Sequence, residues 1–260
     1  MMGAVPLDDR GLLLGDGLFE TLLWKDGALV LGGAHWARMA AGAATLGLPA
    51  PTEPAFLDCA VAAVRDADLA GDRAAVRVTL TAGSGGRGLD RPVALQTRLF
   101  ATAAPSAKLA APASLAIASV RRNEASPASR LKTLAYLDNV LARREAQTAG
   151  AGEAVMLNTK GELACGAVAN LFWIEGDALC TPAPEAGCLP GIMAAQIRSA
   201  AASLGAAVRE ARQGPAALEA AGAIFLTSSL AGVRPAHLVG RPFEPHPMVA
   251  ALSKAVEAYA

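Results

Sequence analysis

The stretch that most constrains the fold is EAVMLNTKGELACGAVANLFWIEGDALCTP, residues 153–182, because turn signals interrupt it too often for a helix. The turn signals at Asn158–Gly161 and Glu175–Asp177 separate three short apolar runs that are typical of β-strands. Strands joined by such short turns pair in antiparallel meanders, whereas a doubly wound sheet needs strict alternation of strands with helices. The sequence therefore predicts the α+β class.

A mixture of helices and strands is also predicted on either side of this meander. Before the meander, the predicted elements are a hairpin over 8–30 that turns at Lys25–Gly27, helices over 34–48 and 53–66, strands over 74–83 and 94–103, and a helix from Leu134. The last of these helices has Leu134, Leu137, Val140 and Leu141 on one face. After the meander, we expect a helix introduced by Pro190–Gly191, strands over 206–212 and 223–229, and a final helix over 247–260. Small and proline-bearing residues over 103–113 have the composition of a linker. We therefore expect two domains, residues 1–106 and 107–260.

Charge and composition argue against several classes of function. Lys plus Arg and Asp plus Glu are 23 each, so no excess charge favours nucleic acid or an anionic membrane surface. The start, MMGAVPLDDR, lacks the basic and apolar regions of a signal peptide, and no run of about 18 apolar residues predicts a membrane span. The four cysteines lack a CxxC pair and the histidines number three, so no metal site is predicted. We expect a cytoplasmic protein with reduced thiols and with neither nucleic acid nor membrane as a partner.

Lys132 lies in RLKTLAYLDNVLARREAQTAG, just before a predicted helix and between Leu131 and Leu134. Two interpretations are open at this stage. The stem of such a lysine often covers apolar surface while its ammonium group reaches water. Alternatively, partial burial leaves the amine neutral and nucleophilic, so that it can form a Schiff base with a carbonyl group. One residue does not decide between them.

Four further features could bind a phosphate or a carboxylate. LPGIM opens a helix at Gly191, where the first backbone N–H groups favour an anion. FLTSSLAG ends a strand with the adjacent hydroxyls of Thr227, Ser228 and Ser229, although such hydroxyls more often cap their own turn. Arg38 on a helix and Arg87 on a glycine-dense loop are equally typical of exposed surface. Each feature is weak alone, but with Lys132 they are what pyridoxal phosphate needs.

The order of these motifs along the chain resembles one known family. The motifs are DRGLLLGDGLFET from Asp9, HWARM from His35, LTAGSGGRGL from Leu80, LKTLAYLDNVLARREA from Leu131, NTKGELACGAVANLFW from Asn158, LPGIM from Leu189 and FLTSSLAGVRPA from Phe225. They span almost the whole chain, which on this basis resembles the class IV aminotransferases, the fold-type IV pyridoxal-phosphate enzymes. That group includes branched-chain and D-amino acid aminotransferases and 4-amino-4-deoxychorismate lyases.

The resemblance implies a fold and a cofactor site. The fold would be that of D-amino acid aminotransferase, with a smaller N-terminal α/β domain, a larger C-terminal domain and pyridoxal 5'-phosphate between them. Lys132 falls on the Schiff-base lysine, which also moves protons as general base and acid. The other residues that fall on cofactor contacts are Arg38, Gly191, Ile192, Met193, Ser228 and Ser229 for the phosphate, Tyr136 for the ring oxygen and Cys165 for the ring nitrogen.

The resemblance also implies a substrate site and a partner subunit. Arg87 falls on an arginine that binds the substrate carboxylate in the D-amino acid group, where it reaches in from the partner subunit. Phe19 falls on a substrate-binding position. We therefore expect a homodimer that acts on a small amino or keto acid.

One position departs from the family motif. Five residues before Asn170 the family has a glutamate, which pairs with the pyridine nitrogen of the cofactor; here that residue is Cys165. A thiol, with a reference pKa of about 8.5, is a much weaker partner for a protonated ring nitrogen. Glu162, three residues away on a strand, would face the opposite side. We therefore expect impaired carbanion chemistry, and elimination favoured over transamination.

The reaction that the resemblance favours is that of 4-amino-4-deoxychorismate lyase, which releases pyruvate and leaves 4-aminobenzoate for folate synthesis. GSGGRG, the ending ANLFW and the chain length support it, whereas Tyr136 stands where the lyases carry an arginine. One alternative is a class IV aminotransferase for branched-chain or D-amino acids. A second alternative, based on Cys165, is a non-catalytic relative that binds pyridoxal phosphate.

Overall fold

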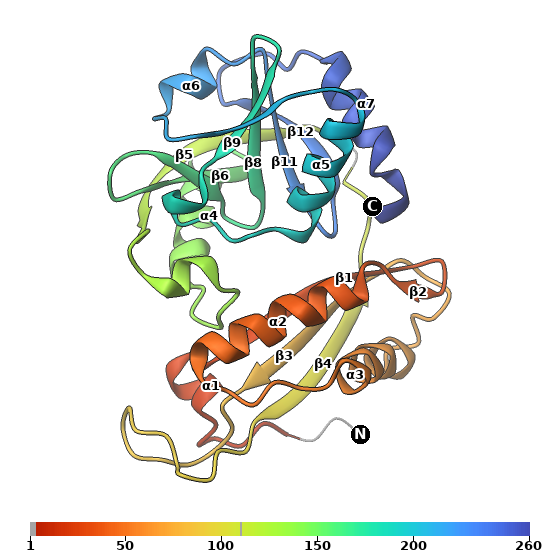
Figure 1. Cartoon of the computed structure of the whole chain (residues 1–260), viewed down its shortest axis with the longest axis vertical. Helices are drawn as coiled ribbons and strands as arrows, with labels where there is room; N and C mark the ends of the chain where they lie inside the picture. The colour runs from red at the N-terminus through yellow and green to blue at the C-terminus, as the bar shows by residue number, and fades with distance from the viewer. Residues whose placement is uncertain (1–3, 110) are drawn as a thin grey trace. The chain divides into compact units, whose positions relative to one another are not determined.

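The computed structural model describes residues 4–109 and 111–260 (Figure 1). Residues 1–3, the first residues of the MMGAVPLDDR segment, and residue 110, in the expected linker, lie outside the described residues. The chain divides into two compact units: unit 1 is Met1–Ala107 with Leu131–Ala135, and unit 2 is Lys108–Arg130 with Tyr136–Ala260. Both units combine a sheet with packed helices, which confirms the α+β class.

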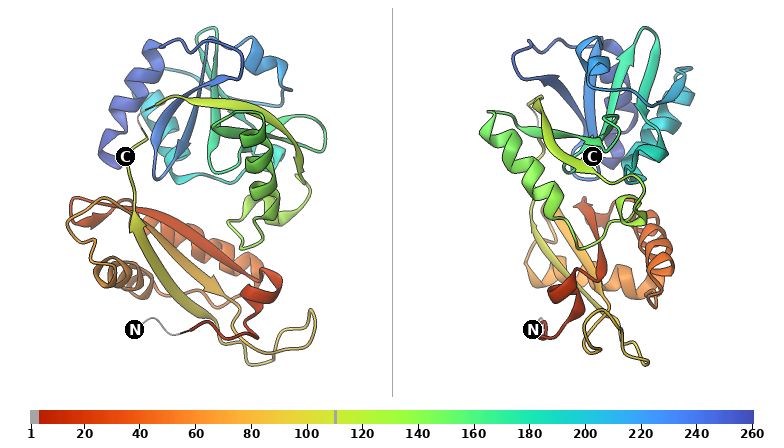
Figure 2. Two further views of the ribbon diagram at one scale, coloured as in Figure 1. Left: turned by 180° about the vertical axis from the view of Figure 1, so that it is seen from behind. Right: turned by 90° about the vertical axis from the view of Figure 1, so that its left-hand side faces the viewer.

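Unit 1 is a four-stranded antiparallel sheet with helices on one face. In sheet order its strands are β2 (Ala28–Leu29), β1 (Gly17–Lys25), β3 (Ala74–Thr81) and β4 (Arg98–Pro105), and its helices are α1 (Arg10–Leu14), α2 (Gly32–Leu46) and α3 (Glu53–Asp66). α2 packs on β1, and α3 packs on β3 and β4. α2 lies in front of the sheet in Figure 1 and behind it in the left view of Figure 2. Leu22, Met39, Phe56 and Val78 contribute to the core between the layers.

The expected hairpin over 8–30 is wrong in its first part. Arg10–Leu14 forms α1, because the side chain of Asp9 accepts a hydrogen bond from the Gly11 N–H and caps the helix start. Gly15 ends the helix with a φ of 68°, a left-handed conformation that favours glycine. The turn of the hairpin lies at Asp26 and Gly27, where it was expected, and both residues have positive φ.

Unit 2 is built on an eight-stranded mixed sheet. In sheet order its strands are β10 (Val208–Ala211), β9 (Ala178–Pro182), β8 (Asn170–Glu175), β11 (Ala223–Ser228), β12 (Gly232–Leu238), β5 (Ala113–Arg122), β6 (Glu153–Asn158) and β7 (Leu163–Gly166). Its helices are α4 (Leu137–Thr148), α5 (Ile192–Ser203), α6 (Ala216–Glu219) and α7 (Pro247–Ala255), with short 3-10 turns at Pro127–Arg130, Pro184–Ala186 and Glu257–Tyr259.

Both faces of this sheet are buried. On β8, Trp173 faces one core, whereas Phe172 and Ile174 face a second core that α5 and α7 complete. The ring of Phe172 stacks on that of Phe225 with centroids 5.1 Å apart. The alternation of side chains along each strand thus supplies apolar groups to two layers at once.

The meander contains four strands rather than the three that we predicted. A tight turn, in which the Gly166 N–H donates to the Ala169 carbonyl, divides the middle run into β7 and β8. Two strands of unit 2, β5 and β12, were not predicted at all. β5 pairs in parallel with both β6 and β12, and such long-range pairing leaves little signal in the local sequence.

The apolar face expected on the helix after Lys132 is not the buried one. α4 begins at Leu137, and Leu137, Val140 and Leu141 are 67%, 59% and 41% exposed. The residues of α4 that face β5 and β6 are Asn139, Ala142 and Ala146. Small side chains let this helix approach the sheet closely, so the large apolar groups remain on the outside.

Candidate active site

Lys132 lies on an extended segment of unit 1 that runs along the edge of β1. The Phe19 N–H donates to the Lys132 carbonyl at 2.9 Å, and the Leu134 N–H donates to the Gly17 carbonyl at 3.0 Å. Gly17 permits this approach, because a Cβ there would lie 2.8 Å from Leu134 Cδ1 and 2.3 Å from the Leu80 carbonyl oxygen. The expected helix start at Leu134 is therefore wrong, and strand pairing instead fixes the backbone of Lys132.

The amine of Lys132 is partly withdrawn from water. Its Nζ lies 4.2 Å from the centroid of the Phe19 ring. Burial lowers the pKa of Lys132 to about 8; Arg38 and Arg77 also lower this pKa, and Glu20 raises it. An amine with this pKa is neutral in an appreciable fraction of molecules at physiological pH, and the neutral form is the nucleophile. This environment favours the second of the two interpretations of Lys132.

A buried carboxylate, Glu20 on β1, fixes Arg38 on α2. Nε and Nη2 of Arg38 donate to the two Glu20 oxygens at 2.7 and 2.6 Å, and His35 Nδ1 lies 2.7 Å from Glu20 Oε2. Burial opposes ionisation of Glu20, but the hydrogen bonds from Arg38 and His35 outweigh it and lower the pKa of this carboxyl. Arg38 is thus a guanidinium with a set orientation, of the kind that binds a phosphate.

Sequence reasoning missed Glu20 as a site residue. Leu18, Leu22 and Trp24 share its face of β1, and all three belong to the core under α2 and α3. A carboxylate in this register of an otherwise apolar strand face is the signal that could have identified it, because buried carboxylates are rare unless they are paired.

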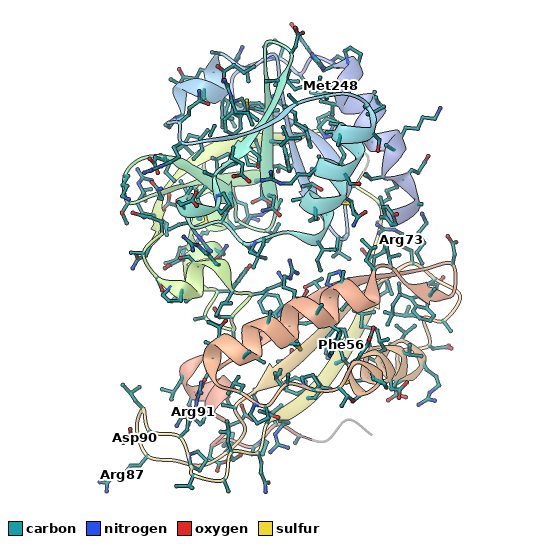
Figure 3. All side chains as sticks on the ribbon, in the orientation of Figure 1. Phe56, Arg73, Arg87, Asp90, Arg91 and Met248 are labelled. Carbon is teal, nitrogen blue, oxygen red and sulfur yellow. The ribbon has the colours of Figure 1, made fainter. Side chains whose placement is uncertain are left out.

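Arg87 lies at the tip of the glycine-rich loop between β3 and β4, and its side chain projects away from the sheet (Figure 3). The loop is held by Arg10, whose guanidinium donates to the carbonyls of Gly88, Leu89 and Asp90 at 3.3, 2.9 and 3.1 Å. The charged neighbours of Lys132 in unit 1 include Glu20, Arg38 and Arg77, whereas Arg87 is carried at the tip of its loop. Phe19, by contrast, contacts the amine directly.

The start of α5 and the end of β11 meet around Asn170 in unit 2. Asn170 pairs with Thr227, and its Nδ2 donates to the Leu189 carbonyl at 2.8 Å. Gly191 is the N-cap of α5 without a side-chain cap, and a Cβ there would lie 1.8 Å from Asn170 Oδ1. The first N–H groups of α5, at Ile192 and Met193, therefore have no side-chain cap, and the start of a helix is a place that favours an anion.

The two predicted serines follow at the end of β11. The hydroxyl of Ser228 accepts from the Ala231 N–H at 3.3 Å and so caps its own turn, which was the alternative interpretation. Ser229 is the next residue of this turn and is partly buried.

Cys165 is buried in β7 opposite Met156. Burial raises the pKa of its thiol to about 11, so the group is neutral at physiological pH. Glu162 is directed elsewhere, because it accepts hydrogen bonds from Asn158 and Arg212. Tyr136 is the N-cap of α4 and is partly buried.

Within residues 4–109 and 111–260, no group of three or more His, Cys, Asp or Glu side chains could hold a metal ion. None of the helices within these ranges is long and apolar enough to cross a membrane.

Comparison with known proteins identifies the family. The sequence profile of the amino-transferase class IV family matches residues 17–239. A Vibrio harveyi aminodeoxychorismate lyase is 28% identical over 243 residues, which are 92% of this chain and 88% of that protein. A Methanocaldococcus jannaschii protein, provisionally named as a branched-chain-amino-acid aminotransferase, is 32% identical over 194 residues, 72% of this chain and 66% of that protein.

The fold is shared as well. A Legionella pneumophila protein, whose solved structure bears the provisional name 4-amino-4-deoxychorismate lyase, superposes with a TM-score of 0.91 at 29% identity and covers 100% of this chain and 97% of its own. Enzymes of the matched family use pyridoxal phosphate and act on small amino and keto acids. The chain belongs to the amino-transferase class IV family and is a pyridoxal-phosphate-dependent enzyme.

Proposed function

We propose that this enzyme is a 4-amino-4-deoxychorismate lyase, which eliminates pyruvate from its substrate and leaves 4-aminobenzoate. The observation that carries the choice of reaction is Cys165, a neutral thiol where the family pairs a carboxylate with the ring nitrogen of the cofactor. A protonated ring nitrogen makes the cofactor a strong electron sink, which transamination requires. Elimination depends on it less, so a neutral partner favours the lyase.

The residues present fit pyridoxal phosphate. Unit 1 offers the amine of Lys132 for the aldehyde and the guanidinium of Arg38 for the phosphate. Unit 2 offers the N–H groups of Ile192 and Met193 at the start of α5, where no side chain caps the helix and where Gly191 lets Asn170 pack closely. When bound, the cofactor supplies an electron sink for bonds at the amino-bearing carbon of the substrate.

Lys132 would hold the cofactor covalently, and once the substrate has displaced it, its free Nζ would move the proton of the reaction. A general base works best when its pKa lies near the operating pH, and burial brings the pKa of this amine to about 8. Ser229 adds a hydroxyl for the phosphate, and Tyr136 adds a phenol for the ring oxygen. The Ser228 oxygen accepts from the Ala231 N–H, which orients this hydroxyl and leaves its O–H able to donate to the phosphate.

Phe19 and Arg87 are the proposed substrate contacts. Phe19 already touches the amine of Lys132, so its ring limits the space for the substrate side chain. Arg87 binds the substrate carboxylate from the partner subunit of a homodimer, because the loop that carries it projects away from its own unit (Figure 3). Such a dimer would cover the apolar side chains that each unit exposes, among them Leu137 on α4 and Leu13 on α1.

A class IV aminotransferase is the second candidate. The relative from Methanocaldococcus jannaschii favours it, as does Tyr136, which stands where lyases of this family carry an arginine. The two candidates share every proposed role of Lys132 and Arg38, and they differ in what happens to the substrate after its proton has been moved.

Purified enzyme distinguishes the candidates. Borohydride reduction should fix the cofactor on the peptide that contains Lys132, as detected by mass spectrometry, and the Lys132→Ala variant should show no such adduct. Release of pyruvate from aminodeoxychorismate without a keto acid supports the lyase. Exchange of an amino group between an amino acid and a keto acid supports the aminotransferase instead. An adduct with neither activity refutes both candidates and identifies a binding protein.

A further inference from the structure

We propose that Glu20 is a positioning residue of the Lys132 site, which fixes the Arg38 guanidinium and supplies the negative charge that the cations around the amine require. The inference rests on the proposed function, in which Lys132 carries the cofactor. Glu20 does not itself touch the cofactor or the substrate. It acts through its two neighbours on α2 and through its field at the amine.

The geometry around Glu20 leaves the carboxylate little freedom. Both of its oxygens accept from Arg38, at 2.7 and 2.6 Å, in the two-pronged arrangement that fixes the plane of a guanidinium. The second oxygen also lies 2.7 Å from His35 Nδ1. Glu20 and His35 are each at most 1% exposed, so water does not compete for these contacts.

His35 does not neutralise Glu20. Burial lowers the pKa of His35, so its imidazole is neutral at physiological pH. An ionised carboxylate only accepts, and therefore the Nδ1 atom carries the proton and donates it to Glu20. Nε2 is buried without a hydrogen-bond partner among the described residues. Burial without a partner costs less for the unprotonated nitrogen of a neutral ring than for the N–H of a charged ring, so this agrees with a neutral imidazole. His35 thus orients Glu20 and leaves its charge intact.

The charges around the amine show what Glu20 balances. Arg38 and Arg77 both disfavour a proton on Lys132, and Glu20 is the group that favours one. The guanidinium of Arg77 lies 3.6 Å from the centroid of the same Phe19 ring that Lys132 contacts. Without Glu20, the partly buried guanidinium of Arg38 and the more exposed one of Arg77 would act on the amine unopposed, and the proton of Lys132 would be held more weakly.

The test measures the charge of Lys132 in the cofactor-free full chain. The rate of Lys132 acetylation by acetic anhydride, followed by peptide mass spectrometry, is recorded as a function of pH for the wild type, Glu20→Gln and Arg38→Met. We expect the midpoint of the profile to fall by about one pH unit in Glu20→Gln and to rise in Arg38→Met. The double variant should return towards the wild type, because the two removed charges oppose each other.

The direction of the change separates this proposal from a general loosening of the site. If Glu20 were merely structural, its loss would admit water and raise the midpoint towards that of an exposed lysine. Asp9→Asn is the matched control, since Asp9 is also a buried, paired carboxylate of unit 1, bonded to Thr81 and Arg98, and it should leave the midpoint unchanged. A midpoint in Glu20→Gln that is unchanged or raised overturns the proposal.

This outcome is independent of the proposed function, because no cofactor or substrate is present in the labelling experiment. A cofactor adduct on Lys132 together with an unresponsive midpoint refutes the role of Glu20 alone. A midpoint that falls, in a protein that forms no adduct, supports the role of Glu20 and refutes the proposed function.

Discussion

Replacing Lys132 with methionine is expected to stabilise the cofactor-free protein at neutral pH. The folded environment lowers the pKa of this amine from its ordinary 10.5 to about 8. At about 1.4 kcal/mol per pH unit, holding the amine protonated in the native state costs roughly 3 kcal/mol. Loss of the contact between the ammonium and the Phe19 ring offsets about 1 kcal/mol of this, so the free energy of unfolding should rise by about 2 kcal/mol.

The pH dependence gives a stricter test of the same reasoning. Below about pH 8 the amine is protonated in both the folded and the unfolded state, and the folded state bears the full cost of burying the charged amine. Between about 8 and 10.5 the unfolded state binds more protons than the native state, so the contribution of Lys132 to stability improves as the pH rises. Above this window both states are neutral at Lys132, and the advantage of the methionine variant should disappear.

Urea unfolding of the cofactor-free protein across this pH range measures the effect, because bound cofactor would stabilise the native state by mass action. Lys108→Met is the control, since Lys108 is exposed and its replacement should change stability by less than about 0.5 kcal/mol at any pH. A Lys132→Met variant that is less stable than the wild type at pH 7, or a difference that does not depend on pH, would refute a destabilised ammonium.

Three further predictions concern other parts of the chain. Cys165→Glu should raise amino-group exchange with keto acids at least about tenfold relative to pyruvate release, because a carboxylate holds the ring nitrogen protonated; an unchanged ratio would contradict our account of the thiol. Gly17→Ala should lower the free energy of unfolding by roughly 1–3 kcal/mol in urea, since its Cβ would meet Leu134 and the backbone of β3; unchanged stability would mean that the segment moves freely. Aspartate at Leu137 and Val140 should shift sedimentation towards the monomer without loss of helicity, whereas aspartate at Leu204, which is also more than half exposed, should not; a persistent dimer would place the interface elsewhere.

Local sequence determined much of the fold. Helix α3 spans Glu53–Asp66 as predicted, because Thr52 caps its start and a proline occupies its first turn. The turn signals of the meander lie where they were expected, between β6 and β7 and between β8 and β9. These features depend on residues close together in the chain, so a window of about ten residues contains the information that they need.

The order of the motifs also determined the family and the candidate residues. Lys132, Arg38 and Cys165 were singled out from the sequence, and in the structure Lys132 and Arg38 lie within electrostatic reach of each other. The sequence could not show that the Lys132 segment is extended. Its partner is Gly17, far away in the chain, and strand pairing with β1 prevails over the helical spacing of the residues that follow.

Only the tertiary structure decided the electrostatics of the site. The pKa of Lys132 depends on burial beside Phe19 and on Glu20, Arg38 and Arg77, which come from β1, α2 and β3. The exposure of Leu137 on α4 was likewise decided by how closely the helix approaches the sheet. Charge state and burial are sums over neighbours in space, and a pattern along the chain records only neighbours in sequence.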